Sequence, residues 1–305
     1  MSAPKVAVAP RSGRHDSLVA AVETGGGAVV DPAEAEALVW ADAARPDLLP
    51  EVLASAPGLR WVQLPFAGIE NFVDLLDHER IWTCGKGVYA PPVAEHALAL
   101  TLAGLRHLVG YGRATRWEGP AGRNLLGAEV VILGGGEITR VLLGLLEPFG
   151  CTTTVVRNRD EPVPGATRTV GTDRLPDVLP GAEVVVLALA LTPETTGIIG
   201  ATELAVMADH AWLVNVARGR HVVTDDLVAA LRDGAIGGAG LDVTDPEPLP
   251  PEHPLWSLPN VLITPHVGNT PEMGVPLLAA RVTENVRRFA AGEDLLGVVD
   301  VDLGY

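Results

Sequence analysis

Short and almost continuously apolar segments recur along this chain and constrain its fold more than any other feature. The segment 183–189 reads EVVVLAL, and similar segments occupy 129–133 and 211–216. A strand that is apolar on both faces has to be covered on both faces, as the inner strands of a parallel sheet are. Stretches with helical spacing lie between these segments, so strand and helix alternate. The pattern predicts an α/β protein built on doubly wound parallel sheets.

Two long helices divide this alternation into two α/β parts. One is expected from Val93 to about Val109, and the other from Pro271 to about Ala291, near the end of the chain. If the last helix packs back on the first part, that part is discontinuous. We therefore expect a flavodoxin-like substrate domain with a Rossmann-type dinucleotide-binding domain inserted in it. The expected boundaries are 1–92 with 271–305 for the first domain and 93–270 for the second.

Charge and cysteine content limit the partners and the compartment. Lys and Arg number 22 against 38 Asp and Glu, which gives a formal charge of −16. An excess of carboxylates repels phosphate backbones, so we expect no nucleic-acid partner. Cys84 and Cys151 are too few for a disulfide scaffold, and no apolar run approaches the ~20 residues of a membrane span. The histidines show no metal-ligand spacing. We expect a cytoplasmic protein that uses neither a membrane nor a metal.

A glycine turn joins one predicted strand to the helix that follows it. Gly134 permits a tight turn, and Gly136 lets a pyrophosphate approach the backbone. The N–H groups at the helix N-terminus, at Glu137 and Ile138, supply positive potential to the phosphates. This order of elements predicts a dinucleotide site, and a merely structural turn is the alternative. Thr139 stands where the pattern has a third glycine, which puts the packing of this helix and its cofactor affinity in question.

The end of the next strand bears on which nicotinamide cofactor binds. An NAD site usually has Asp or Glu about 20 residues after the turn, where it accepts a hydrogen bond from the ribose 2′-OH. This chain instead has Arg157, Asn158 and Arg159. Guanidinium groups suit a 2′-phosphate. NADP is therefore the preferred cofactor, and NAD is the alternative if the arginines only form a solvated turn.

Three polar residues are expected at the carboxyl ends of neighbouring strands, where open parallel sheets bind ligands. Arg218, Glu247 and His266 each follow a predicted strand. Each alone could be an ordinary surface arginine, acidic loop residue or capped histidine. Together they suit hydride reduction of a 2-keto acid. In this reaction we expect His266 to donate a proton to the developing alkoxide and Glu247 to orient the imidazole. Arg218 is expected to bind the substrate carboxylate and to polarise the carbonyl.

Several longer blocks contain these residues in a fixed order. They are GGGEIT, LALTPETTGIIG, NVARG, LDVTDPEPLP and PNVLITPHVGNT, with WVQLPFAGIENF in the first domain. In order and spacing they resemble the D-isomer-specific 2-hydroxyacid dehydrogenase family. The resemblance implies that Arg218, Glu247 and His266 are the catalytic residues.

The resemblance also implies binding residues. Asp242 would hold the nicotinamide carboxamide, and Thr192 lies in a block that contacts the cofactor. The turn formed by Ala67, Gly68 and Ile69 would bind the substrate carboxylate through its N–H groups. A homodimer, paired through the nucleotide domain and the long helix before it, is the expected assembly.

These observations predict an NAD(P)-dependent oxidoreductase that acts on a small D-2-hydroxy acid or its 2-keto acid, such as glyoxylate or hydroxypyruvate. The alternative is a nucleotide-sensing, non-catalytic binding protein that resembles a corepressor. Retention of all three catalytic residue types weighs against that alternative, and so does the acidic surface.

Overall fold

In the computed structural model, which describes residues 3–158 and 161–304, the apolar runs form the inner strands of a parallel sheet. The sheet order is β12-β11-β10-β9-β6-β7-β8, and these neighbours pair in parallel. Its strands are β6 (Glu129–Leu133), β7 (Thr152–Val156), β8 (Arg168–Val170), β9 (Val184–Leu187), β10 (Trp212–Asn215), β11 (Gly238–Leu241) and β12 (Val261–Ile263). Because β6 pairs with both β7 and β9, the strand order reverses at β6, as in a Rossmann sheet.

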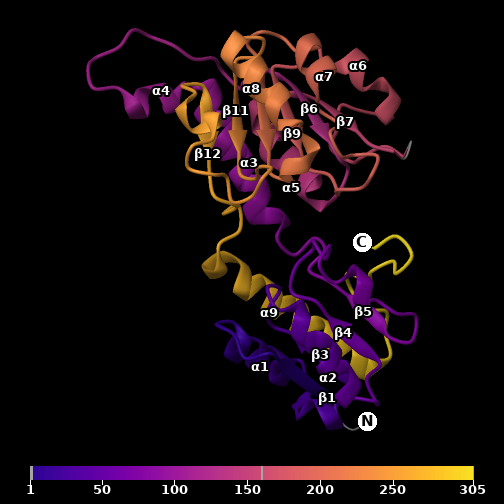
Figure 1. The fold of residues 1–305 in the computed structure, drawn as a ribbon. Helices are drawn as coiled ribbons and strands as arrows, with labels where there is room; N and C mark the ends of the chain where they lie inside the picture. The colour runs from indigo at the N-terminus through magenta and orange to yellow at the C-terminus, as the bar shows by residue number, and fades with distance from the viewer. Residues whose placement is uncertain (1–2, 159–160, 305) are drawn as a thin grey trace. The chain divides into compact units, whose positions relative to one another are not determined.

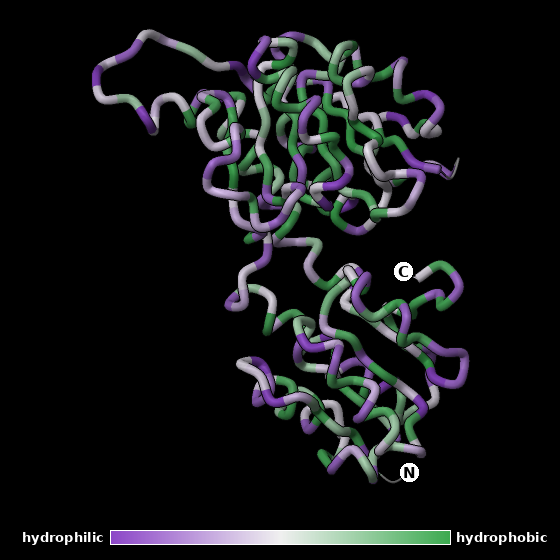
Figure 2. Tube along the Cα trace, viewed as in Figure 1, coloured by the Kyte–Doolittle hydropathy of each residue, from purple (hydrophilic) through white to green (hydrophobic). Residues whose placement is uncertain are grey.

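Helices cover both faces of this sheet (Figure 1). They are α3 (Ala90–Leu105), α5 (Glu137–Leu146), α6 (Leu175–Val178), α7 (Ala201–Val206) and α8 (Thr224–Asp233). Val130 and Ile132 pack with α3 and α5, whereas Val131 and Leu133 pack with α6, α7 and α8. Alternate residues of one strand thus enter different apolar layers. Figure 2 shows the resulting band of hydrophobic strands inside this unit.

The described residues divide into two compact units, 90–269 and the combination of 1–89 with 270–305. The second has a parallel sheet of order β2-β1-β3-β4-β5, which is the flavodoxin-like order. Its strands are β1 (Lys5–Ala9), β2 (Ala28–Val29), β3 (Ala37–Trp40), β4 (Trp61–Gln63) and β5 (Ile81–Thr83), and its helices are α1 (His15–Thr24), α2 (Leu49–Ser55) and α9 (Pro271–Ala291). The fold class predicted from the sequence is confirmed.

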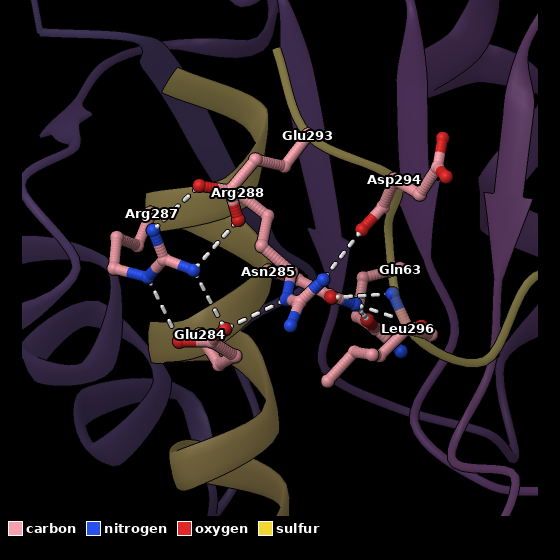
Figure 3. A network of polar contacts seen from close by, with 8 residues as sticks. All are labelled: Gln63, Glu284, Asn285, Arg287, Arg288, Glu293, Asp294 and Leu296. Carbon is pink, nitrogen blue, oxygen red and sulfur yellow. Dashed lines mark hydrogen bonds and ion pairs between the residues drawn. The ribbon is translucent and has the colours of Figure 1, made fainter. Parts of the chain in front are cut away.

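A buried amide attaches α9 to the sheet of its unit (Figure 3). Asn285 is fully buried, and its Nδ2 donates to Oε1 of Gln63 at 2.9 Å and to the carbonyl of Leu296 at 3.0 Å. Its Oδ1 accepts the N–H of Leu296 at 2.8 Å. Buried polar atoms need such partners, because an unpaired one costs about 1–3 kcal/mol. The C-terminal helix therefore belongs to the first α/β part, although 180 residues of the other unit (90–269) separate them in the chain.

Two expectations about local structure were wrong. The helix expected to reach Val109 ends at Leu105, and α4 (Leu108–Arg113) begins after His107, which has a left-handed backbone with φ 56°. Strands β2, β5 and β8 were not predicted, because each has only two or three residues and lacks an extended apolar run. Among the described helices, none combines the length and apolar character needed to cross a bilayer.

Candidate active site

His266 and Glu247 meet at the carboxyl edge of the sheet in residues 90–269. Glu247 follows β11, His266 follows β12, and Nδ1 of His266 lies 2.6 Å from Oε1 of Glu247. An ionised carboxylate only accepts hydrogen bonds, so Nδ1 carries the hydrogen and Nε2 remains available for proton exchange. Both side chains are about half exposed, at 51% and 42%. The arrangement is that of an acid/base imidazole oriented by a carboxylate.

The backbone of His266 is unusual. Its φ is 54°, in the left-handed region that residues other than glycine rarely adopt. Its N–H donates to the carbonyl of Asp242 at 2.8 Å and to that of Thr264 at 3.0 Å. A backbone of this kind persists only where its surroundings hold it, and such residues concentrate at functional sites.

Asp242 makes several of the contacts that maintain the backbone around His266. Its side chain is only 4% exposed, and its Oδ1 accepts from Oγ1 of Thr264 at 2.6 Å and from the N–H of Val267 at 2.9 Å. Its Oδ2 accepts the N–H of Gly268 at 2.9 Å. Burial raises the pKa of Asp242, but hydrogen bonds from His96, Thr264 and these N–H groups outweigh it and lower the pKa from 3.8 to about 2. The carboxylate is therefore ionised at neutral pH.

Arg218 follows β10, the next strand in the sheet, on a turn that Asn215 closes. Nδ2 of Asn215 donates to the carbonyl of Arg218 at 2.9 Å, and Oδ1 of Asn215 accepts the N–H of Ala217 at 3.0 Å. A Cβ on Gly219 would lie 2.0 Å from the carbonyl carbon and oxygen of Thr244. Only glycine lets the Arg218 turn come this close to the segment that leads to Glu247.

The glycine turn after β6 has the geometry of a phosphate cradle. Gly134 has φ 104°, and a Cβ there would lie 2.2 Å from the carbonyl oxygen of Ala188. Gly136 is the N-cap of α5 and provides no side-chain acceptor for the first N–H groups, those of Glu137 and Ile138. A Cβ on Gly136 would meet no atom within 4 Å, so the space beside these donors is open. The turn therefore fits a pyrophosphate.

Thr139 fits into the structure at the position where the pattern has its third glycine. Its side chain is fully buried, and its Oγ1 donates to the carbonyl of Gly134 at 2.8 Å. The hydroxyl therefore connects the first turn of α5 to the residue that begins the glycine turn. The departure from the glycine pattern adds a hydrogen bond at the point where close packing was in question.

Arg157 directly follows β7 and lies beside this turn. Its Cδ lies 3.0 Å from the place where a Cβ on Gly135 would be, and its guanidinium donates to the carbonyl of Glu161 at 3.4 Å. The side chain thus lies against the glycine turn, where a 2′-phosphate would need a cation. Asn158 is exposed, and Arg159 falls outside the described residues.

A buried histidine that the sequence patterns did not single out organises the loop of Thr192. Nδ1 of His221 lies 3.0 Å from the carbonyl oxygen of Thr195, and Nε2 lies 3.3 Å from that of Leu189. Burial lowers the pKa of His221, and the contacts with the two carbonyl oxygens, which raise it, do not outweigh the burial. Within the loop, the N–H of Thr192 donates to Oγ1 of Thr195 at 2.8 Å. No spacing signal marks His221, because its partners are backbone carbonyls.

The turn of Ala67, Gly68 and Ile69 lies in the other unit, after β4. The N–H of Phe72 donates to the carbonyl of Ile69 at 2.8 Å, and that of Gly85 donates to the carbonyl of Phe66 at 3.0 Å. Ala67 is exposed and Ile69 is buried. The turn thus follows a strand at the carboxyl edge of its own sheet, as a ligand-binding turn does.

Comparison with known proteins identifies the family. Residues 98–268 match the sequence profile described as D-isomer specific 2-hydroxyacid dehydrogenase, NAD binding domain. The chain belongs to the D-isomer specific 2-hydroxyacid dehydrogenase family. The chain is also 38% identical to a protein of Corynebacterium melassecola described as an uncharacterized protein in the proB 3′ region, over 95% of this chain and 97% of that one.

Two further similar proteins have names that state an activity or a family. Glyoxylate/hydroxypyruvate reductase A of Photorhabdus laumondii is 31% identical, over 88% of this chain and 87% of that one. The crystal structure of a D-isomer specific 2-hydroxyacid dehydrogenase from Xanthobacter autotrophicus, in complex with NADPH and MES, is 30% identical and has a TM-score of 0.85. That match covers both chains completely. The family predicted from the sequence motifs is confirmed.

Proposed function

We propose that this chain is an NADPH-linked reductase of small 2-keto acids of the glyoxylate and hydroxypyruvate class, with D-2-hydroxy acids as products. The observation that carries the proposal is the bond between Nδ1 of His266 and Oε1 of Glu247, at the carboxyl edge of a sheet with a phosphate cradle. The description of the Photorhabdus relative supports the substrate class. The NADPH in the Xanthobacter structure supports the cofactor.

Each side chain at this edge has a role in the proposed reaction. The nicotinamide, when bound, supplies the hydride. Nε2 of His266 holds the proton that passes to the substrate carbonyl oxygen, and Glu247 stabilises the imidazolium form. The guanidinium of Arg218 pairs with the substrate carboxylate and polarises the carbonyl beside it. The resemblance to the family supports a further proposal, that the turn formed by Ala67, Gly68 and Ile69 offers N–H groups to a substrate carboxylate.

The proposed cofactor contacts follow from the donors and acceptors along this edge of the sheet. The N–H groups of Glu137 and Ile138 take the pyrophosphate, and Arg157 takes the 2′-phosphate. Oδ2 of Asp242 accepts one N–H from Gly268 and retains capacity for a second donor, which suits a carboxamide NH₂. Thr192 lies on the loop that His221 holds and would line the same site.

Steady-state kinetics test the reaction. We expect NADPH oxidation with glyoxylate or hydroxypyruvate, and a fall in kcat of about 10²–10⁴-fold in His266→Ala with an unchanged Kd for NADPH. The matched control is His253→Ala, because His253 lies on the loop before β12 and has no proposed role. Tight NADPH binding without turnover of any small 2-keto acid, with NADPH or NADH, would instead identify a nucleotide-sensing protein.

A charge reversal tests the choice of cofactor. Arg157→Asp should lower the ratio of kcat/KM for NADPH to that for NADH by about 10- to 100-fold, because charge-assisted hydrogen bonds are worth about 1.5–3 kcal/mol. Arg174→Asp changes the net charge equally, but Arg174 pairs with Asp177 on the surface and should leave the ratio unchanged. An unchanged ratio in Arg157→Asp would exclude this side chain as the 2′-phosphate ligand.

The segment between α4 and β6 is proposed to pair with a second copy of the chain. Figure 1 shows it extending away from the sheet of its unit. It contains Trp117, which is fully exposed at 100%. An indole in water is typical of an interface anchor. Light scattering should give the mass of a dimer for the wild type and a shift toward monomer for Trp117→Ser, and a monomeric wild type would contradict the pairing.

A further inference from the structure

His96 lies on α3 and contacts two residues near the catalytic edge. Its Nε2 is 2.9 Å from Oγ1 of Thr264 and 3.3 Å from Oδ1 of Asp242. The side chain of His96 is 21% exposed, so this contact is largely shielded from water. The reaction proposed above assigns His96 no role.

The number of hydrogens on each group determines whether His96 or Thr264 donates in the bond between them. The hydroxyl of Thr264 has one hydrogen, and it points to Oδ1 of Asp242 at 2.6 Å, an ionised oxygen that only accepts. Oγ1 of Thr264 can therefore only accept from His96, so Nε2 of His96 carries a hydrogen. The bonds run in one direction, from the imidazole N–H through the hydroxyl to the carboxylate. Bonds arranged in this way polarise and strengthen one another.

The far end of this chain of bonds determines the conformation of the segment that contains His266. The carboxylate of Asp242 accepts the N–H groups of Val267 and Gly268, and its main-chain carbonyl accepts the N–H of His266. These bonds hold His266 at φ 54°, which places its Nδ1 against Glu247. If the carboxylate turned, the N–H groups of Val267 and Gly268 would lose their acceptors, and the backbone beside His266 would lose the bonds that maintain it.

We propose that His96 is a positioning residue for the imidazole of His266. It orients the carboxylate of Asp242 in two ways, through the hydroxyl of Thr264 and by its own contact with Oδ1 at 3.3 Å, and so maintains the backbone at 266–268. The catalytic consequence rests on the proposed function of His266. The effect on the backbone does not rest on it, so the two can fail separately.

Two substitutions separate the donor from the bulk of the side chain. His96→Leu removes the N–H, whereas His96→Gln places an amide N–H at a similar reach. The control is His210→Leu, because His210 pairs only with its neighbour Asp209 at the surface of the same unit.

Amide hydrogen exchange in the cofactor-free protein tests the positioning itself. We expect the amides of residues 266–268 to exchange at least tenfold faster in His96→Leu and at the wild-type rate in His96→Gln and His210→Leu. Unchanged exchange in His96→Leu would overturn the proposal, whether or not the protein reduces 2-keto acids. Equal acceleration in the Gln and Leu variants would also overturn it, because bulk rather than the donor would then matter.

Turnover tests the consequence for catalysis. His96→Leu should lower kcat about tenfold and change KM for the keto acid less than twofold, and His96→Gln should restore most of kcat. Thr264→Val removes the bridging hydroxyl but leaves the direct contact of His96 with Asp242 at 3.3 Å, so adding His96→Leu to Thr264→Val should lower kcat by less than the product of the two single effects. Additive losses would show that His96 acts by another route. Accelerated exchange together with a wild-type kcat would refute the catalytic part and leave the proposed function standing.

Discussion

Asp242→Asn tests how strongly the carboxylate stabilises the folded chain. The substitution keeps the shape of the side chain, removes its charge and replaces one acceptor oxygen with an NH₂ group. In the folded protein, burial raises the pKa of Asp242, whereas hydrogen bonds from His96, Thr264 and two N–H groups lower it to a net value of about 2, against 3.8 for the free side chain. At about 1.36 kcal/mol for each pKa unit, this difference corresponds to about 2 kcal/mol of folding free energy at neutral pH. We expect Asp242→Asn to lose at least this amount.

The pH dependence distinguishes loss of the ionised carboxylate from poor packing of the introduced amide. Because the pKa is lower in the folded than in the unfolded chain, the stabilisation is complete above about pH 5 and is lost as the pH falls toward about 2. Linkage predicts that about half of it has gone by about pH 3. The wild type should therefore lose about 1 kcal/mol between neutral pH and pH 3 that the variant does not lose.

Urea denaturation of both proteins at about pH 7 and about pH 3 measures these quantities, with separate transitions fitted if the two units unfold separately. Asp209→Asn is the control, because Asp209 is 87% exposed and its contact with His210 should contribute less than about 1 kcal/mol. A difference between wild type and Asp242→Asn below about 0.5 kcal/mol at neutral pH would refute the reasoning. So would a difference that stays constant with pH.

Three other substitutions test separate parts of the structure. Gly219→Ala places a Cβ 2.0 Å from the Thr244 backbone, so we expect urea denaturation to show a loss of about 1–3 kcal/mol in the free energy of unfolding. We also expect kcat/KM to fall at least tenfold. Unchanged kinetics would contradict the required close approach. Thr139→Val removes the bond to Gly134 and should cost about 1 kcal/mol in the same assay, and equal or greater stability would show that the hydroxyl contributes nothing. Asn285→Leu leaves the N–H of Leu296 without its acceptor and should cost about 1–3 kcal/mol in calorimetry, so an unchanged transition would mean that other contacts hold α9.

The carboxyl edge of this sheet shows how much local sequence patterns can predict. Arg218, Glu247 and His266 follow β10, β11 and β12, which are neighbours in the sheet. Carboxyl ends of parallel strands lie on one edge, so the position of each residue after an apolar run was sufficient to predict that all three lie along that edge. The glycine turn was predictable for the same reason, because strand, turn and helix are contiguous in the chain. These features depend on the spacing of apolar residues along the chain and on the backbone conformations that a few neighbouring residues can adopt.

Long-range contacts determined the structural features that the sequence patterns did not predict. The break after Leu105 and the short strands β5 and β8 have no distinct periodicity, so packing against distant segments determines them.

The sequence by itself determined the alternation of strand and helix, the parallel sheets and the residue types at their carboxyl edge, because these depend on periodicity and on local backbone geometry. The tertiary structure alone decided that Asn285 fastens α9 to Gln63, and that His96 reaches Thr264 across 168 residues of chain. Hydrogen bonds between such distant residues depend on the packing of whole elements. No local pattern of residues encodes which of them will meet.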